Sequence, residues 1–372
     1  MPAATSPGRR WGRDRPPVAL FESWRGRYAD SPRAISEYLG LHDVAVERLW
    51  SVAPGQSAEF PDDVGLVDRH TPGYFWKLAT TDLLITNDIV SRHYLSGPGV
   101  TYVQCMHGTP LKHIGRDDDL GGYRGARAHH RRMRRDIAKW DALLSPSPAI
   151  TPILRSAYEY DGVVLETGLP RNDVLSNDVG NVIRDRTRAA LGVPPDATVV
   201  LYAPTWRDDD TSGAGLVAQS FTPDWTELVA ALPDLRILFR AHNNIVAAAP
   251  DVPHIIDASG YPDIAELYLA ADVLVSDYSS VIYDFAVTGR PIICFAPDLE
   301  HYRNDLRGLY FSYEEWAPGP ILATTGELVD ALADLGAVAR SSQERYRRFA
   351  ADFCSLHDGH ATERVVAALG LA

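Results

Sequence analysis

The sequence predicts an α/β protein built from two Rossmann-like domains, each with a parallel sheet, that face each other across a cleft. Three observations support this fold class. Short apolar runs typical of buried strands alternate with helical patterns. This alternation starts a second time after Asn172-Asp173. The chain has 372 residues, which is long for a single hydrophobic core.

The first half of the chain begins with a polar tail and continues as a βα series. Residues 1–16 are rich in Arg, Pro and Gly without periodicity, and we expect them to be disordered. A strand at 18–21 leads to a helix in which we expect Ser31 to be the cap and Pro32 the first residue. Further strands are predicted at 48–52, 83–86, 101–105, 142–144 and 163–165, with helices near 73–79 and up to Lys139. These elements form a predicted domain of residues 17–175.

The second half repeats the pattern as a predicted domain of residues 176–372. A helix ends near Gly192, and a polar-faced helix is expected from Ser341 onward. Strands are predicted at 198–203, 236–240, 254–256, 273–275 and 291–295, with helices at 264–270 and from the serine turn near 279 to about Thr288. Ligands of such folds bind in the cleft between the domains, beyond the carboxyl ends of the strands.

Composition excludes several classes of function. A net charge of −13 argues against general nucleic-acid binding. The three cysteines have neither metal-type nor CxxC spacing, and we expect Cys105 and Cys294 to be buried thiols of a protein in a reducing cytoplasm. No signal peptide is apparent, and no stretch reaches the ~20 apolar residues of a membrane span. Any membrane association is therefore expected to be peripheral.

Polar residues follow the ends of several predicted strands, at 106–112, 204–208, 241–243 and 276–280. If the strands are parallel, these loops converge on one cleft. The last of them, Ser276-Asp277-Tyr278-Ser279-Ser280, turns directly into a helix. The free N–H groups of a helix N-terminus favour an anion, and the hydroxyls of Ser279 and Ser280 add donors. A phosphate site is one interpretation of this turn, and a simple N-cap at Ser279 is the other.

Two histidines at strand ends are candidate catalytic residues. His107 precedes Gly108, which lets a substrate approach closely, and an imidazole suits a general base that takes a proton from an attacking hydroxyl. His242 could donate to a phosphate oxygen or to the leaving group. The alternative for each is a structural loop histidine bonded to a carbonyl.

Other charged residues have two interpretations each. Arg207 could pair with a phosphate bidentately, or with the neighbouring carboxylates of 208–210. Asp277 and Asp284 are candidate ligands of a nucleotide or polyol. Asp284 could bind sugar hydroxyls, or could instead be solvated or capping. The segment 124–135 carries six arginines, which form either a solvated face or a surface for an anionic membrane or a polyphosphate acceptor. These arginines are Arg124, Arg127, Arg131, Arg132, Arg134 and Arg135.

A set of motifs in fixed order identifies a family that the chain resembles. They are FESWRGRYADSPRAISEYL, QCMHGTPLKHIGRD, KWDALLSPSPAI, GLPRNDVL, LYAPTWRDD, FRAH, SDYSSVIYDFAVTGRPIICF and DLEHYRNDLRGLYF…APGP. From about Phe21 to Pro320 the sequence is similar to the CDP-glycerol glycerophosphotransferases, the teichoic acid primases and polymerases of Gram-positive bacteria. Any one of these motifs is weak evidence, whereas the set is highly specific.

The resemblance implies a GT-B fold and transfer of a polyol phosphate from a CDP-linked donor. Residues 17–175 are then expected to be the acceptor-side domain and residues 176–372 the CDP-donor-binding domain. It implies that His107 is the base and that His242 binds the donor phosphates. Thr205, Arg207, Ser279 and Ser280 are then expected near those phosphates, Asp284 near the donor, and Arg307 with Gly308 as residues that close over it. Asn243-Asn244 after His242 depart from the aromatic or proline that the family often has, which changes the expected shape of the donor pocket.

The expected activity is transfer of a polyol phosphate, with glycerol phosphate favoured over ribitol phosphate, to an acceptor hydroxyl during synthesis of a cell-surface polymer, with release of CMP. The alternatives are a nucleotide-sugar glycosyltransferase on the same fold and a non-catalytic subunit that binds polymer. We expect a lipid-linked or polyol-phosphate acceptor, no nucleic acid, and a peripheral location on the cytoplasmic face of the membrane. Relative to the family, a large added N-terminal region is lacking, so attachment is expected to depend on segment 124–135 or on partners. No metal-ligand cluster is apparent, so we predict no definite cofactor and leave a role for Mg²⁺ open.

Overall fold

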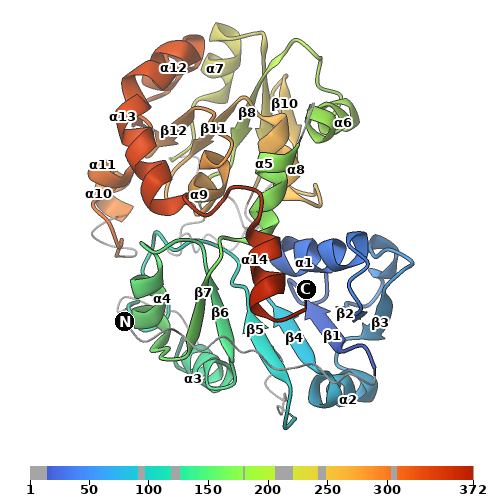
Figure 1. Ribbon diagram of the computed structural model, residues 1–372. Coiled ribbons are helices and arrows are strands. Elements are labelled where there is room, and N and C mark those ends of the chain that lie inside the picture. The colour runs from blue at the N-terminus through green and yellow to red at the C-terminus, as the bar shows by residue number, and fades with distance from the viewer. Residues whose placement is uncertain are drawn as a thin grey trace.

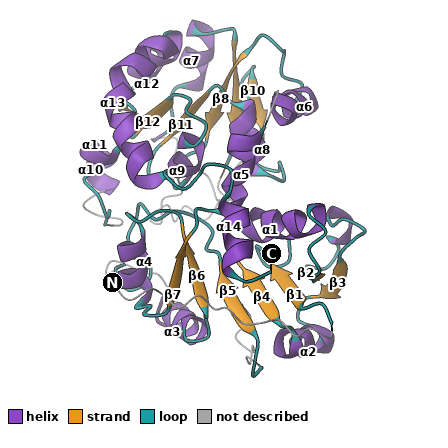
Figure 2. Ribbon diagram, viewed as in Figure 1, coloured by secondary structure: helices purple, strands orange, loops and turns teal. Residues whose placement is uncertain are grey.

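The computed structural model describes residues 15–90, 97–118, 126–178, 181–205, 221–241, 249–302 and 308–371, without the side chains of Ala126, Arg127 and His129 (Figure 1). The predicted tail at 1–16 lies almost wholly outside these residues. Two parallel sheets, each flanked by helices, face each other (Figure 2). The α/β class with two Rossmann-like domains is thereby confirmed.

The first domain contains a seven-stranded sheet in the order β3-β2-β1-β4-β5-β6-β7, in which every pairing is parallel. Its strands are β1 (Val18–Glu22), β2 (Glu47–Val52), β3 (Gly65–Asp68), β4 (Leu83–Thr86), β5 (Thr101–Gln104), β6 (Ala142–Ser145) and β7 (Val163–Glu166). Its helices are α1 (Asp30–Leu41), η1 (Ser57–Glu59), α2 (Pro72–Thr80), α3 (Ala126–Ile137) and α4 (Thr151–Tyr158). The central strands are buried on both faces, which is why they appear in the sequence as continuous apolar runs.

The second domain contains a six-stranded parallel sheet in the order β10-β9-β8-β11-β12-β13. Its strands are β8 (Thr198–Tyr202), β9 (Leu235–Phe239), β10 (Ile255–Asp257), β11 (Val273–Ser276), β12 (Ile292–Phe295) and β13 (Ile321–Leu322). Its helices are α6 (Val182–Ala190), α7 (Trp225–Ala231), α8 (Ile264–Ala270), α9 (Val281–Ala286), α10 (Leu299–His301), α11 (Tyr313–Trp316), α12 (Thr325–Ala333) and α13 (Leu335–Phe353). The segments η2 (Pro170–Asn172) and α5 (Asp173–Asn177) connect the two domains.

The chain crosses between the domains twice, which the predicted boundary at 176 misses. After α13 the chain returns, and α14 (Ala361–Ala368) packs on the first domain beside α1 (Figure 1). Val365, Val366 and Leu369 belong to the same buried cluster as Phe21 and Trp50. The carboxylate of Asp173 accepts the N–H groups of Ala361 and Thr362, which fixes the start of α14. Residues 361–371 therefore belong to the first domain.

The helix predicted to begin at Pro32 starts two residues earlier than expected. Its first residue is Asp30, its N-cap position is Ala29, and no side chain caps it, so the prediction that Ser31 is the cap is wrong. The Ser31 hydroxyl is buried instead and accepts the backbone N–H of Arg171 at 3.4 Å. The start of α1 therefore contacts the interdomain connection.

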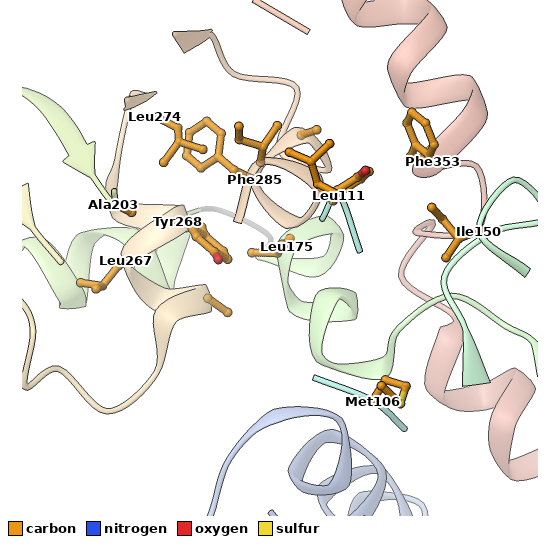
Figure 3. Packing of buried hydrophobic residues seen from close by; sticks show 14 of the residues in the cluster. Met106, Leu111, Ile150, Leu175, Ala203, Leu267, Tyr268, Leu274, Phe285 and Phe353 are labelled. Carbon is orange, nitrogen blue, oxygen red and sulfur yellow. The ribbon is translucent and has the colours of Figure 1, made fainter. Parts of the chain in front are cut away.

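A continuous apolar cluster joins the two domains. It includes Met106 and Ile150 of the first domain and Tyr268 and Leu274 of the second (Figure 3). The thiols of Cys105 and Cys294 are buried, as the sequence predicted, and burial raises the pKa of Cys294 to about 12. Members of this cluster such as Met106 and Tyr268 also line the interdomain cleft.

Candidate active site

A cleft of about 2090 Å³ separates the two domains and is lined by strand ends from both. His107, Ser279, Ser280 and Asp284 are among its lining residues. The sequence predicted that these loops converge, and parallel strands bring them to one edge as expected. Thr205 and Asp277 lie behind this lining, because both are almost fully buried.

His107 follows β5, and its side chain is exposed to the cleft. Its Nδ1 lies 2.9 Å from the backbone carbonyl oxygen of Asn87. A carbonyl oxygen can only accept a hydrogen bond, so Nδ1 carries the proton of the neutral imidazole and Nε2 keeps its lone pair. The ring of Trp24 packs against the imidazole with centroids 5.0 Å apart. These contacts hold the tautomer and the orientation that a general base requires.

Three adjacent strands supply this cluster. Trp24, Asn87 and His107 follow β1, β4 and β5, which are neighbours in the sheet. Asn87 is completely buried, and its side-chain carbonyl accepts the backbone N–H of Trp24 at 3.1 Å. Asn87 therefore fixes the positions of both Trp24 and His107 through hydrogen bonds. Sequence reasoning missed Trp24 and Asn87, although both occupy the same strand-end position that singled out His107.

The backbone beside His107 adopts an uncommon conformation. Met106 has φ of +56°, in the left-handed region that non-glycine residues rarely occupy. Its N–H donates to the side chain of Gln104 at 3.0 Å, and Gln104 in turn donates to the carbonyl of Asp88. Such strain persists only where surrounding contacts hold it, and it is common at functional sites.

The loop of His107 touches the serine turn of the other domain. A Cβ atom added to Gly108 would lie 3.1 Å from the Ser280 hydroxyl, so only a glycine leaves this approach unhindered. Gly108 was predicted to make room for a substrate, and the group that approaches it here is Ser280. The structure thus brings together the two motifs that the sequence singled out, from opposite sides of the cleft.

The serine turn differs in detail from its prediction. Helix α9 has only six residues and ends at Ala286, so its dipole is small. Ser279 accepts the N–H of Val281 at 3.4 Å, a long bond that partly satisfies the capping interpretation. Both serine side chains are half-buried and line the cleft. The hydroxyls, rather than the helix dipole, are the donors that this turn offers.

Asp277 holds two strand ends together. Its Oδ1 accepts the backbone N–H groups of Thr205 at 2.8 Å and of Tyr278 at 2.6 Å. Its backbone carbonyl accepts the hydroxyl of Tyr313 at 2.7 Å. These contacts join the ends of β8 and β11. The predicted contact of Asp277 with a nucleotide or polyol stays a prediction.

Asp284 is buried and paired, which excludes the solvated alternative. Arg171 donates to both of its carboxylate oxygens, at 3.1 and 2.8 Å, and the Asn172 amide donates to Oδ1 at 2.8 Å. Arg171 and Asn172 belong to the GLPRNDVL motif, whose role sequence reasoning did not assign. The predicted place of Asp284 near the donor is consistent with its position in the cleft lining and stays a prediction.

Several predicted site residues lie outside the described part of the chain. These are His242, Arg207, Arg307 and Arg124, together with the side chain of Arg127. The segment after Arg307 is described. His113 donates its N–H to the Gly308 carbonyl at 2.8 Å, and Tyr310 donates to the Leu111 carbonyl at 3.0 Å. This segment of the second domain therefore runs along the loop that follows His107.

The arginines of α3 that the structure describes are exposed. They are Arg131, Arg132, Arg134 and Arg135. Among the described residues, none of these four forms an ion pair, and α3 presents them as exposed positive charges in an acidic protein. Across the described ranges, no helix has the length and apolarity of a bilayer span. The same residues contain no group of three or more His, Cys, Asp or Glu side chains arranged to hold a metal ion.

Comparison with known proteins gives a consistent result. Residues 9–370 match the family described as CDP-Glycerol:Poly(glycerophosphate) glycerophosphotransferase. The chain is 37% identical to the teichoic acid glycerol-phosphate transferase of Staphylococcus aureus, covering 94% of this chain and 91% of that protein. It is 34% identical to the teichoic acid poly(glycerol phosphate) polymerase of Bacillus subtilis, and spans about half (48%) of that longer protein.

Solved structures agree with these relatives. A variant of the wall teichoic acid polymerase TagF with CDPG superposes with a TM-score of 0.85 at 34% identity, covering 94% of this chain and 88% of that chain. The UDP-GlcNAc 2-epimerase of Neisseria meningitidis has a TM-score of 0.54 at 11% identity, covering 94% of this chain and 98% of that chain. At that identity the likeness shows the fold alone, and it supports the predicted GT-B arrangement of two Rossmann-like domains.

Proposed function

Because the chain belongs to the CDP-glycerol:poly(glycerophosphate) glycerophosphotransferase family, we propose that it transfers glycerol phosphate from CDP-glycerol to an acceptor hydroxyl in teichoic acid synthesis, with release of CMP. One observation carries the proposal. His107 is exposed and lines the cleft with Nδ1 bonded to the Asn87 carbonyl, and its loop approaches the serine turn of the opposite domain. A proton acceptor and hydroxyl donors are thus combined at one place, as phosphoryl transfer requires.

The reaction begins at the acceptor hydroxyl. Nε2 of His107 takes the hydroxyl proton while the acceptor oxygen forms a bond to the phosphorus on the glycerol side of the donor. The bond from that phosphorus to the bridging oxygen breaks, and the bridging oxygen leaves as part of CMP. Negative charge on the phosphate oxygens grows toward the transition state, so fixed hydrogen-bond donors at those oxygens lower the barrier.

The serine turn supplies hydroxyl donors beside the loop of His107. We assign the hydroxyls of Ser279 and Ser280 to the donor phosphates, because both line the cleft beside the loop of the base. The family resemblance adds Thr205, Arg207 and His242 to the same phosphates and Arg307 to a segment that closes over the donor. Asp277 and Asp284 shape this pocket through the backbone and through Arg171.

Nucleotide release tests the proposal directly. Purified protein is given CDP-glycerol, CDP-ribitol or a UDP-sugar, with a lipid-linked or short glycerol-phosphate acceptor. CMP released from CDP-glycerol supports the proposal, and CMP from CDP-ribitol alone would replace glycerol by ribitol. A nucleoside diphosphate released from a sugar donor would identify a glycosyltransferase. No release from any donor would favour a subunit that only binds polymer.

The exposed arginines of α3 suit an anionic membrane surface, and we propose that they hold the enzyme at the cytoplasmic face of the membrane. Arg131→Gln/Arg135→Gln removes two charges, each worth about 1 kcal/mol near an anionic bilayer, and roughly 30-fold of vesicle affinity is expected to be lost. The matched control is Arg347→Gln/Arg348→Gln, which removes two exposed arginines from α13. Sedimentation with phosphatidylglycerol vesicles measures the difference. Equal binding of the two variants contradicts the proposal, and loss of binding only to poly(glycerol phosphate) would assign α3 to the acceptor.

A further inference from the structure

Arg171 lies between two carboxylates from opposite domains. Its guanidinium donates to Asp30 at 3.2 Å and to Asp284 at 2.8 Å. The side chains are 12% exposed for Arg171 and 6% for each aspartate, so the three charges are almost excluded from water. Asp30 begins α1 of the first domain, and Asp284 lies on α9 of the second. Arg171 itself belongs to η2, where the chain first crosses between the domains.

The Arg171 guanidinium keeps its charge despite burial. Burial alone would lower the pKa of the Arg171 guanidinium, but the nearby carboxylates of Asp284 and Asp30 raise it well above its ordinary value. Two carboxylates share one guanidinium, and further donors satisfy them. The Asn172 amide donates to Asp284 at 2.8 Å, and the Ser31 N–H donates to Asp30 at 2.6 Å. Four of the bonds in this network come from the two terminal nitrogens of Arg171, whereas its buried Nε has no partner among the described residues. A buried network of this kind holds its members in one arrangement.

Each of the two aspartates in this cluster is linked to one half of the active site. Asp30 accepts the indole N–H of Trp24 at 3.2 Å, and the Trp24 ring packs against the imidazole of His107. Asp284 lies in the first turn of α9, the helix that starts directly after Ser280. Arg171 therefore connects the support of the base with the helix that carries the serine turn.

The loop between β1 and α1 depends on these contacts. Trp24, Arg25 and Asp30 all have positive φ, at +44°, +62° and +62°. Non-glycine residues in that region are strained, and the surrounding contacts must hold them there. For Trp24 and Asp30, those contacts include the bonds to Asn87 and to Arg171.

We propose that Arg171 is a positioning residue that sets His107 against the serine turn by joining Asp30 to Asp284. The proposal rests on the proposed function for its kinetic consequence. Its structural part does not depend on the sugar or polyol donor. It states that the buried guanidinium of Arg171, bonded to both domains, holds them in one relative arrangement. A displacement of about 1 Å at reacting groups costs about 100-fold in rate, so a loosened cluster lowers kcat while the donor still binds.

A buried ion cluster can also serve stability alone, and the variants are chosen to separate the two roles. Arg171→Met leaves two carboxylates buried without their partner, which destabilises a protein whatever the cluster does. The triple variant Asp30→Asn/Arg171→Met/Asp284→Asn removes all three charges and is expected to regain most of the lost stability. It does not regain the link between the domains.

The matched control is Arg33→Gln. Arg33 on α1 pairs with Asp263 at the N-terminus of α8, 3.0 Å apart, so it is also an ion pair between the domains. The side chains of Arg33 and Asp263 are 29% and 31% exposed, and Arg33 also pairs with Glu37 of its own helix. Among the described residues, Arg33 forms no hydrogen bond to Trp24, Arg171 or Asp284. This variant is expected to keep kcat within about threefold.

CMP release and denaturant unfolding are measured for the wild type and for each variant. The triple variant is expected to unfold near the wild-type denaturant midpoint, with kcat about 100-fold lower and KM for CDP-glycerol changed less than threefold. Arg171→Lys is expected to recover part of kcat, because one ammonium can reach only part of the bidentate geometry. A triple variant that regains both midpoint and kcat overturns the proposal.

A distance measurement decides the proposal without turnover. Spin labels are attached at Asp62→Cys in the first domain and at Asp330→Cys in the second, because both positions are exposed. Double electron–electron resonance then measures the interdomain distance. The distance distribution is expected to broaden in the triple variant and to stay narrow in Arg33→Gln. An unchanged distribution in the triple variant overturns the proposal. If the wild type releases no CMP and the triple variant still broadens the distribution, the proposed function is refuted and the positioning role stands.

Discussion

His107 lines the interdomain cleft and His357 contacts the interdomain connection, and the two have opposite environments. His107 is exposed to the cleft, with Nδ1 bonded to a carbonyl and Nε2 open. His357 is buried, and burial together with the charges of Arg171 and Arg364 lowers its pKa to about 4. The role proposed for His107 is to take a proton during turnover, whereas burial and nearby charge keep His357 neutral. Neighbouring charge and access to water, rather than residue type, decide between the two roles.

The largest expected effect is at the exposed histidine. His107→Ala removes the proposed base and leaves a small side chain at an exposed position, so we expect turnover to fall about 1000-fold with an unchanged denaturant midpoint. CMP release from CDP-glycerol and equilibrium unfolding measure the two quantities. Near-normal turnover would contradict the proposed role of His107 as the base, and both histidines would then be structural.

The buried histidine is expected to affect stability and its dependence on pH. The pKa of His357 is about 4 in the folded protein and 6.5 for an ordinary imidazole, so between these values the unfolded chain binds more protons than the folded chain. The His357 contribution to the unfolding free energy therefore falls as pH is lowered, by about 2 kcal/mol between pH 7 and pH 5. His357→Asn is expected to lose this part of the pH dependence.

Asp136 acts with the opposite sign in the same pH range. Burial raises its pKa to about 6 although Trp140 and Tyr102 donate hydrogen bonds to it. The folded chain then binds more protons than the unfolded chain between about 4 and 6, so this carboxyl stabilises the fold as pH is lowered. The His357 effect must be read as the difference between wild type and His357→Asn, each unfolded in urea at pH 7 and pH 5. Parallel pH dependence in the two proteins would contradict the lowered pKa of His357.

The smallest expected effect concerns the support of His107. Trp24→Phe keeps a ring beside the imidazole but loses the indole N–H that donates to Asp30. A hydrogen bond to a charged group is worth about 1.5–3 kcal/mol, and we expect kcat to fall about tenfold with KM nearly unchanged. Steady-state kinetics with Trp24→Ala as the stronger variant check this. Equal kcat in wild type and Trp24→Phe would confine the role of Trp24 to packing.

Most of the fold could be predicted because buried parallel strands are continuous apolar runs. Strands β1, β4 and β5 occur within one residue of their expected ends. The two strands that were missed are edge strands. β3 is mostly exposed, and β13 has two half-buried residues, so neither leaves a strong apolar signal. The return of α14 to the first domain was also missed, because periodicity shows that a helix is amphipathic but not which core it covers.

The candidate site was predictable only where function depends on residue type at a strand end. This reasoning placed His107 and the serine turn in one cleft, as the structure has them. The contacts of Arg171 join residues 141 and 113 positions away, and no local pattern encodes such distances. The roles of Arg207, His242 and Arg307 stay predictions from the family resemblance.

The second crossing of the chain affects how the protein is made. Val365, Val366 and Leu369 complete the apolar core of the first domain, yet they are translated after the whole of the second domain. Domains usually fold in the order in which the ribosome delivers them. Here the first domain to emerge must wait with part of its core open until α14 is made, while the second domain already has its complete sequence. We therefore expect the usual order to be reversed during synthesis, with the second domain folding before the first.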